Sequence, residues 1–175
     1  MGERMEYIYF YETIIGTLGI CEDELGITDI YLAKDNKSYN NKELKETELI
    51  KEAARQIKEY LKGERKEFTL PLHLKGTEFQ RKVWEALSKI EYGATVCYKD
   101  VAIHVGNEKA SRAVGMANNK NPILIVIPCH RVIGKNGSLV GYGGGLELKS
   151  FLLKLEKDSY KPSLTWLDNK SLRFI

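Results

Sequence analysis

The stretch Ile123–Gly145, ILIVIPCHRVIGKNGSLVGYGGG, decides much of the fold and the site expected of this chain. Its first five residues are all apolar, which predicts a buried strand, and Pro128 would end that strand because proline has no N–H for the ladder. The thiol of Cys129 and the imidazole of His130 come next, and three consecutive glycines close the stretch. This order predicts a nucleophile facing a pocket that admits a flat group close to the backbone.

Cys129 needs activation if it is to act as a nucleophile. A free cysteine has a pKa of about 8.5, so little thiolate is present at neutral pH. His130 is the nearest histidine in the sequence, but neighbours on an extended segment point to opposite sides, so direct contact and a bridging water both stay open. A base also needs a third group to orient it, and Glu156 is the candidate carboxylate. The alternative for Cys129 is a buried structural thiol.

The composition is that of an ordinary globular protein. Apolar residues make up 43% and charged residues 29% of the 175 residues, and no apolar run approaches the roughly 20 residues of a membrane-spanning helix. The N-terminus lacks the apolar core of a secretory signal. Three scattered cysteines, Cys21, Cys97 and Cys129, form neither a paired framework nor a metal-ligand spacing, which favours a reducing compartment. We therefore expect a cytoplasmic protein that does not associate with membranes.

The charge is distributed unevenly along the chain. Residues 1–74 carry 11 Lys/Arg and 15 Asp/Glu, whereas residues 75–157 carry 13 Lys/Arg and 7 Asp/Glu. A basic half beside an acidic half suggests that one of them meets a polyanion such as DNA. Surface charge without a partner is the alternative interpretation.

Residues 1–74 are expected to form a small α+β domain. Alternating and β-branched residues predict an antiparallel three-stranded meander, with strands at Tyr7–Tyr11, Thr13–Ile20 and Ile27–Leu32. Residues 21–26 have the polarity and the glycine of a hairpin connection. An amphipathic helix is predicted over Glu43–Lys62, and Gly63 is a natural stop for it.

Residues 75–158 are expected to form a second, mainly helical domain, followed by a tail over 159–175. Thr77 and Gln80 make a capping box, so a helix begins at Glu78, with Trp84 in its core stripe. Further helices are predicted at Tyr98–Val105, Lys109–Asn118 and Leu146–Glu156, the last with Leu148, Phe151, Leu152 and Leu155 facing inward. Asn136-Gly137 predicts a hairpin between residues 132–133 and 139–140.

Two of these helices form a helix-turn-helix pattern, which occurs in many helical domains as well as in DNA-binding ones. Small residues dominate the second helix, and only Lys109 and Arg112 extend as long polar arms. Such a surface can approach a groove closely and insert one arginine into the base stack. Close packing of two helices would explain the small residues equally well. The basic charge balance favours DNA.

Several motifs together resemble one protein family. Pro128–Ile133, PCHRVI, with Asn121-Pro122 before it and Gly141–Leu146, GYGGGL, after it, closely resembles the O6-alkylguanine-DNA alkyltransferases over about Phe79–Glu156. The resemblance implies a ribonuclease H-like first domain and a winged-helix-like second one. It also implies a suicidal reaction, in which O6-alkylguanine (and possibly O4-alkylthymine) is flipped out of double-stranded DNA and its alkyl group moves to a cysteine.

The resemblance assigns a role to each matching position. It makes Cys129 the alkyl acceptor, His130 its base through water, Glu156 the group that holds the histidine, Asn121 the support of the turn, and Tyr98 the donor to the purine. Arg112 would fill the gap left by the flipped base, beside groove contacts from Ala110, Ser111, Ala113, Gly115 and Asn118. The base pocket would be lined by Cys129, Val132, Tyr142, Gly143 and Gly144.

The sequence departs from the family at two of these positions. Gly143 stands where many relatives have a serine, and Asn118 stands where some have an apolar residue. The zinc cluster of some relatives has no counterpart, no cofactor is implied, and a monomer is expected. Two other functions stay open: a module that recognises alkylated bases without repairing them, which the presence of Cys129 disfavours, and a turnover hydrolase that uses Cys129, His130 and Glu156.

Overall fold

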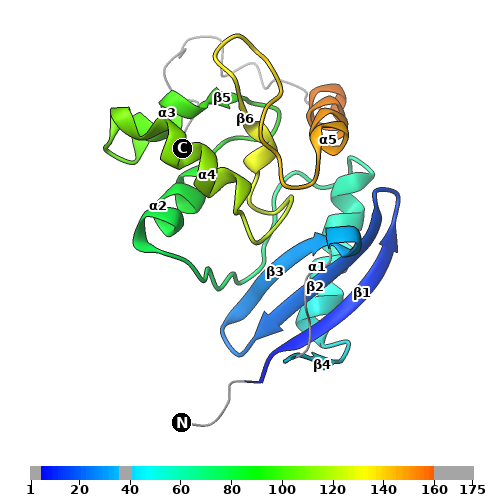
Figure 1. Ribbon diagram of the computed structural model, residues 1–175. Helices are drawn as coiled ribbons and strands as arrows, with labels where there is room; N and C mark the ends of the chain where they lie inside the picture. Colours follow the sequence, from blue (N-terminus) through cyan, green and yellow to red (C-terminus); the bar gives the residue numbers. More distant parts are fainter. Residues whose placement is uncertain (1–4, 36–40, 160–175) are drawn as a thin grey trace. The chain divides into compact units, whose positions relative to one another are not determined.

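The computed structural model describes residues 5–35 and 41–159 and divides the chain into two compact units (Figure 1). The first unit contains residues 1–75 and also 122–126, and the second contains 76–121 and 127–175. The predicted boundary at 74/75 lies one residue from this division, but segment 122–126 was expected in the second domain. Among the described residues, no helix is long and apolar enough to cross a membrane. The predicted tail, with Trp166 and Phe174, lies beyond Ser159 and outside the described residues.

The first unit is built on a four-stranded sheet in the order β3-β2-β1-β4. Three strands form the predicted antiparallel meander: β1 (Tyr7–Thr13), β2 (Gly16–Asp23) and β3 (Gly26–Leu32). The predicted end of the second strand at Ile20 is wrong, because Cys21 to Asp23 continue to pair with β3. The chain reverses at Glu24 and Leu25. Strand β3 then begins at Gly26, whose φ of 149° and close approach to the Pro71 carbonyl exclude a side chain.

Helix α1 (Glu48–Leu61) packs on this sheet, and a short 3₁₀ turn, η1 (Ala33–Asp35), follows β3. The predicted helix start at Glu43 is wrong, because Glu43–Leu44 forms the short strand β4 parallel to β1. The hydroxyl of Thr47 caps α1 by accepting a hydrogen bond from the backbone N–H of Ile50, which satisfies one of the N–H groups that lack a helical partner. Gly63, with φ of 76°, ends the helix as predicted.

The apolar run at 123–127 is buried as predicted, but it is not a strand. Only Ile123 pairs with the sheet, through an isolated parallel bridge to Ile30. The chain then turns, with the Val126 N–H donating to the Leu124 carbonyl and Ile125 held at φ of 72°. A β-branched residue at positive φ is strained. The burial of Ile125, which is fully enclosed, provides the packing that holds it there.

The second unit is mainly helical (Figure 1). Its helices are α2 (Glu78–Leu87), α3 (Tyr98–His104), α4 (Ser111–Asn119) and α5 (Leu146–Ser159), and β5 (Val96–Cys97) pairs in parallel with β6 (Val132–Ile133). The capping box at Thr77 and Gln80 is present, and Trp84 is buried, both as predicted. The indole N–H of Trp84 donates to the Ala117 carbonyl at 2.9 Å, which ties α2 to α4.

Three predictions within the second unit are wrong in detail. Residues 108–110 form a 3₁₀ turn, η2, so α4 begins at Ser111 and not at Lys109. Residues 134–138 do make a tight turn, but Val132–Ile133 pairs with β5 and residues 139–140 are not a strand, so the predicted hairpin does not form. Helix α5 turns Phe151 outward, 39% exposed, and buries Lys149 and Glu156 beside Leu152.

Candidate active site

The cysteine lies on a tight turn, and Asn121 holds that turn in place. Residues 129–131 form the 3₁₀ turn η3, so the turn expected at the cysteine is present. The side-chain N–H₂ of Asn121 donates to the Ile127 carbonyl at 2.8 Å and reaches Cys129 Sγ at 3.0 Å. The thiol is thus fixed by a donor that belongs to its own unit of the structure.

Cys129 is fully buried, and its environment keeps the thiol protonated. Burial raises the pKa of the Cys129 thiol to about 11, although the hydrogen bond from Asn121 and the positive charge of Lys149 act in the opposite direction. A neutral thiol is a weak nucleophile. The site therefore needs a base that removes the proton when the reaction occurs.

His130 is the candidate for such a base, and Glu156 is the candidate for the group that orients it. The two side chains are 0% and 1% exposed, and His130 Nε2 lies 2.7 Å from Glu156 Oε1. Burial lowers the pKa of His130 below its ordinary value, so the imidazole is neutral at neutral pH and can accept a proton. Because Nε2 donates to the carboxylate, Nδ1 is the nitrogen with the lone pair.

The carboxylate of Glu156 has two further partners. Arg131, only 6% exposed, donates to it through Nη2 at 2.9 Å and through Nε at 3.0 Å, and the Gly93 backbone N–H donates at 3.0 Å. Burial acts to raise the pKa of Glu156, but the hydrogen bonds and charges of His130 and Arg131 outweigh it and hold that pKa well below its usual range. Glu156 is therefore ionised.

A buried lysine and a tyrosine donate to the same backbone carbonyl. Lys149 is 0% exposed, and its Nζ donates to the carbonyls of Val132 and Val140, the latter at 2.8 Å. The Tyr98 hydroxyl donates to the same Val140 carbonyl at 2.9 Å. Burial lowers the pKa of Lys149 to about 8 and raises that of Tyr98. Tyr98 therefore keeps its proton and remains a donor.

Comparison with known proteins adds independent evidence. Two models of the 6-O-methylguanine DNA methyltransferase match, the ribonuclease-like domain over residues 7–74 and the DNA binding domain over residues 78–158. The constitutive methylated-DNA–protein-cysteine methyltransferase of Bacillus subtilis is 49% identical over an alignment of 163 residues that covers 90% of this chain and 99% of that protein. The enzyme of the same name from Methanosarcina acetivorans is 47% identical over 86% of this chain and 97% of its own length.

Solved structures agree with these relatives. The crystal structure of the Mycobacterium tuberculosis O6-methylguanine methyltransferase has a TM-score of 0.84 and 38% identity over 94% of this chain and 100% of its own. The structure of that protein in complex with DNA has a TM-score of 0.81, also at 38% identity, over 91% and 98% of the two chains. This chain belongs to the methylated-DNA–protein-cysteine methyltransferase family. It is a DNA-binding repair methyltransferase, and the two-unit architecture expected from the sequence is the family's fold.

Two of the candidate base-pocket residues, Val132 and Tyr142, contact Lys149 and His130. Val132 is fully buried and accepts from Lys149, and the Tyr142 ring stands edge-on to the His130 ring with centroids 6.4 Å apart. A side chain at Gly144 would lie 2.8 Å from Tyr142 and 2.9 Å from Leu148. Glycine at 144 therefore allows the loop to pack, whereas Gly143 is exposed.

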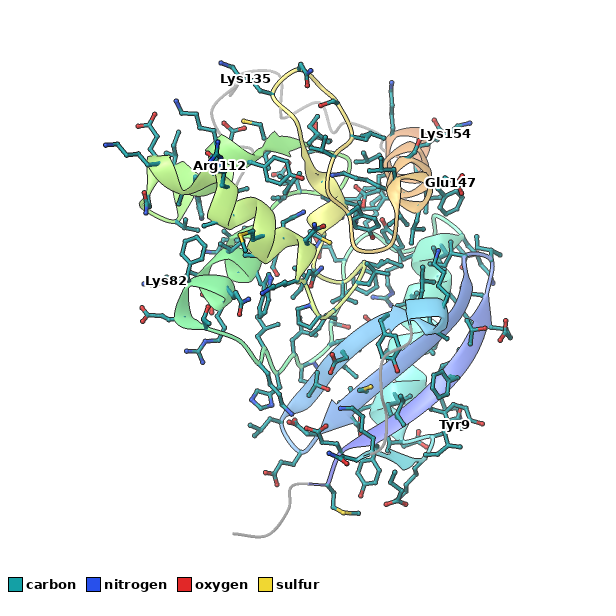
Figure 2. All side chains as sticks on the ribbon, viewed as in Figure 1. Tyr9, Lys82, Arg112, Lys135, Glu147 and Lys154 are labelled. Atoms are coloured by element: carbon teal, nitrogen blue, oxygen red, sulfur yellow. The ribbon has the colours of Figure 1, made fainter. Side chains whose placement is uncertain are left out.

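The candidate DNA-contacting residues differ in how far each side chain is buried. Arg112 is exposed at the start of α4 (Figure 2), and Ala113 is exposed beside it. Ala110, Ser111 and Gly115 are half-buried. Asn118 does not fit its predicted role in the groove, because it is only 1% exposed and its amide lies within 3.4 Å of the Cys129 carbonyl.

Two residues that matter here were given no role from the sequence. Arg131 could have been found from its place in the PCHR motif, next to the proposed base. Lys149 gave no signal, since a lysine on a surface helix is normally solvated. Both are buried in contact with backbone or side-chain groups of the site.

Arg131→Met should destabilise the protein by about 3–5 kcal/mol, because removing one partner of a buried ion pair leaves the other charge uncompensated. The ionised Glu156 contributes stability above its unfolded pKa of about 4.3, and this contribution is lost as the pH falls through the lower folded value. In urea unfolding, the free energy of unfolding should therefore decrease less between pH 7 and pH 3 in the Arg131→Met variant than in the wild type.

The control is Lys154→Met, on the exposed side of α5 (Figure 2), which should change the free energy of unfolding by no more than about 0.5 kcal/mol. Equal effects of the two variants would contradict this account of Glu156.

Proposed function

We propose that this chain removes the alkyl group from O6-alkylguanine in double-stranded DNA by moving it to Sγ of Cys129. In the transfer, Sγ forms a bond to the alkyl carbon as the bond from that carbon to guanine O6 breaks. The thiol proton passes to His130 through a bridging water, and the purine leaves with a negative charge until it is protonated. The observation that carries the proposal is the buried thiol of Cys129 next to a neutral His130 that is hydrogen-bonded to an ionised Glu156.

The other candidate site residues each have a role in this transfer. Asn121 holds the sulfur, and Glu156 keeps the histidine in the tautomer that accepts at Nδ1. Tyr98 donates to the purine as negative charge develops on it, which requires its hydroxyl to leave the Val140 carbonyl; a placed donor of this kind stabilises the transition state. Arg112 fills the space from which the base is extruded. All these groups come from one chain, and we infer that the protein acts as a monomer.

The reaction predicts a single alkylation of Cys129. Incubation with excess duplex carrying one O6-methylguanine should add one methyl group to the intact protein, and peptide mapping should place it on Cys129. Activity should stop at one equivalent, and Cys129→Ala should bind the duplex without gaining mass. Tight lesion binding with no mass change in the wild type would indicate a recognition module instead. Continued release of product beyond one equivalent would indicate a hydrolase.

The rate of transfer should depend on pH through His130. Its pKa lies below the ordinary value of 6.5, so the rate should be constant from about pH 6.5 to 7.5 and should fall in more acidic solution as the imidazole becomes protonated. Ionisation of Cys129, with a pKa of about 11, adds nothing in this range. His130→Gln should slow transfer by about 10²–10⁴ and remove the acidic limb. A wild-type rate that rises steadily through pH 7.5 would show that a preformed thiolate reacts.

Base flipping predicts that Arg112 matters for duplex DNA alone. Arg112→Ala should slow transfer from duplex by about tenfold or more, since unstacking a base costs a few kcal/mol, but should hardly affect transfer from free O6-methylguanine. Lys154→Ala removes an equal charge from α5 and serves as the control in single-turnover kinetics on both substrates. Equal losses on duplex and free base in the Arg112 variant would rule out this role.

A further inference from the structure

The side-chain amide of Asn118 is buried beside Cys129, and only its nitrogen has hydrogen-bond partners among the described residues. Its Nδ2 donates over long distances to the Cys129 carbonyl, at 3.4 Å, and to the Gly141 carbonyl, at 3.5 Å. Its Oδ1 is buried and has no hydrogen-bond partner among the described residues. A buried acceptor without a partner is unfavourable, so such a group calls for an explanation.

The orientation of this amide follows from its neighbours. Carbonyl oxygens only accept, so the N–H₂ end of Asn118 must face Cys129 and Gly141, and Oδ1 must face elsewhere. These two carbonyls belong to Cys129, the proposed alkyl acceptor, and to Gly141, in the glycine-rich loop assigned to the base pocket. Asn118 therefore lies between the turn of the cysteine and the glycine-rich loop, and its acceptor has no partner among the described residues.

Alkylated bases differ in what they can donate to such an acceptor. Alkylation at O6 removes the N1 proton of guanine, and N3 and N7 are acceptors, so the 2-amino group is the one N–H donor left on the base. Alkylation at O4 of thymine removes the N3 proton and leaves no N–H donor. A site built to accept a hydrogen bond rejects a substrate that lacks the donor, because its own acceptor then stays buried and unpaired.

We propose that Asn118 is a specificity-determining residue whose Oδ1 accepts a hydrogen bond from the 2-amino group of the flipped O6-alkylguanine. This rests on the proposed transfer to Cys129. The residue would favour alkylguanine over O4-alkylthymine without taking part in bond making. It replaces the groove contact that the sequence suggested for this position, since the side chain lies inside the unit and not on its surface.

The test compares the effect of removing the Asn118 acceptor with the effect of removing the 2-amino group from the substrate. Wild type and Asn118→Leu, which keeps the approximate volume but removes the acceptor, are compared in single-turnover transfer. The substrates are identical duplexes carrying O6-methylguanine, O6-methylhypoxanthine, which lacks only the 2-amino group, or O4-methylthymine. Asn118→Ala provides a second variant in case leucine disturbs the turn, and circular dichroism checks the fold of both.

Wild type should transfer from O6-methylguanine about tenfold faster than from O6-methylhypoxanthine, and Asn118→Leu should reduce that ratio to near one. The variant should lose about tenfold on O6-methylguanine and should narrow the gap to O4-methylthymine. A purely structural amide, or one whose oxygen is satisfied by water, would slow all three substrates equally and would overturn the proposal. If wild type transfers from none of the duplexes, the proposed function fails; if it transfers normally but the ratio does not change, only the role of Asn118 fails.

Discussion

The second unit depends on one buried carboxylate. An ionised Glu156 at 1% exposure is tolerable only because His130, Arg131 and the Gly93 N–H all donate to it, since a buried charge without partners is strongly unfavourable. These donors come from two different parts of the chain, and Glu156 itself lies on α5. The need to satisfy one charge therefore fixes the final helix, the turn of the cysteine and the segment after α2 relative to one another. It also fixes the ring of His130, the base of the proposed transfer.

Burial also protects Cys129, the single-use nucleophile of the proposed transfer. The Cys129 thiol, with its pKa raised to about 11, is a neutral and enclosed group that reacts poorly with soluble electrophiles. In the proposed transfer, the thiol reacts when an alkyl carbon is placed against sulfur and His130 takes the proton in the same step. Such a design favours selectivity over speed, because the protein must survive until its one substrate arrives.

The loop between β6 and α5 is held in place through its backbone carbonyls. Val140 accepts from both Lys149 and Tyr98, and Gly141 accepts from Asn118. Each of these donors comes from a different helix, so the loop between β6 and α5 is held by side chains and not by strand pairing. This explains why the segment has a defined shape although the predicted hairpin does not form. In the proposed base pocket, the Tyr98 hydroxyl already has a partner, whereas Oδ1 of Asn118 has none among the described residues.

Strong periodicity in the sequence predicted the regular elements, and the PCHR motif marked Cys129 as the candidate nucleophile. The meander, the capping box at Thr77 and the PCHR motif could be predicted because period, cap chemistry and motif are local properties. The start of α1, the pairing of residues 132–133 and the burial of Lys149 could not, because contacts with other segments of the chain decided them. Residues 43–44 pair with β1, residues 132–133 pair with β5, and Lys149 donates to the carbonyls of Val132 and Val140. Only the tertiary structure showed that Glu156 needs Arg131 and that Asn118 points inward. A side chain's role in a buried site depends on which donors and acceptors surround it, and local sequence does not contain that information.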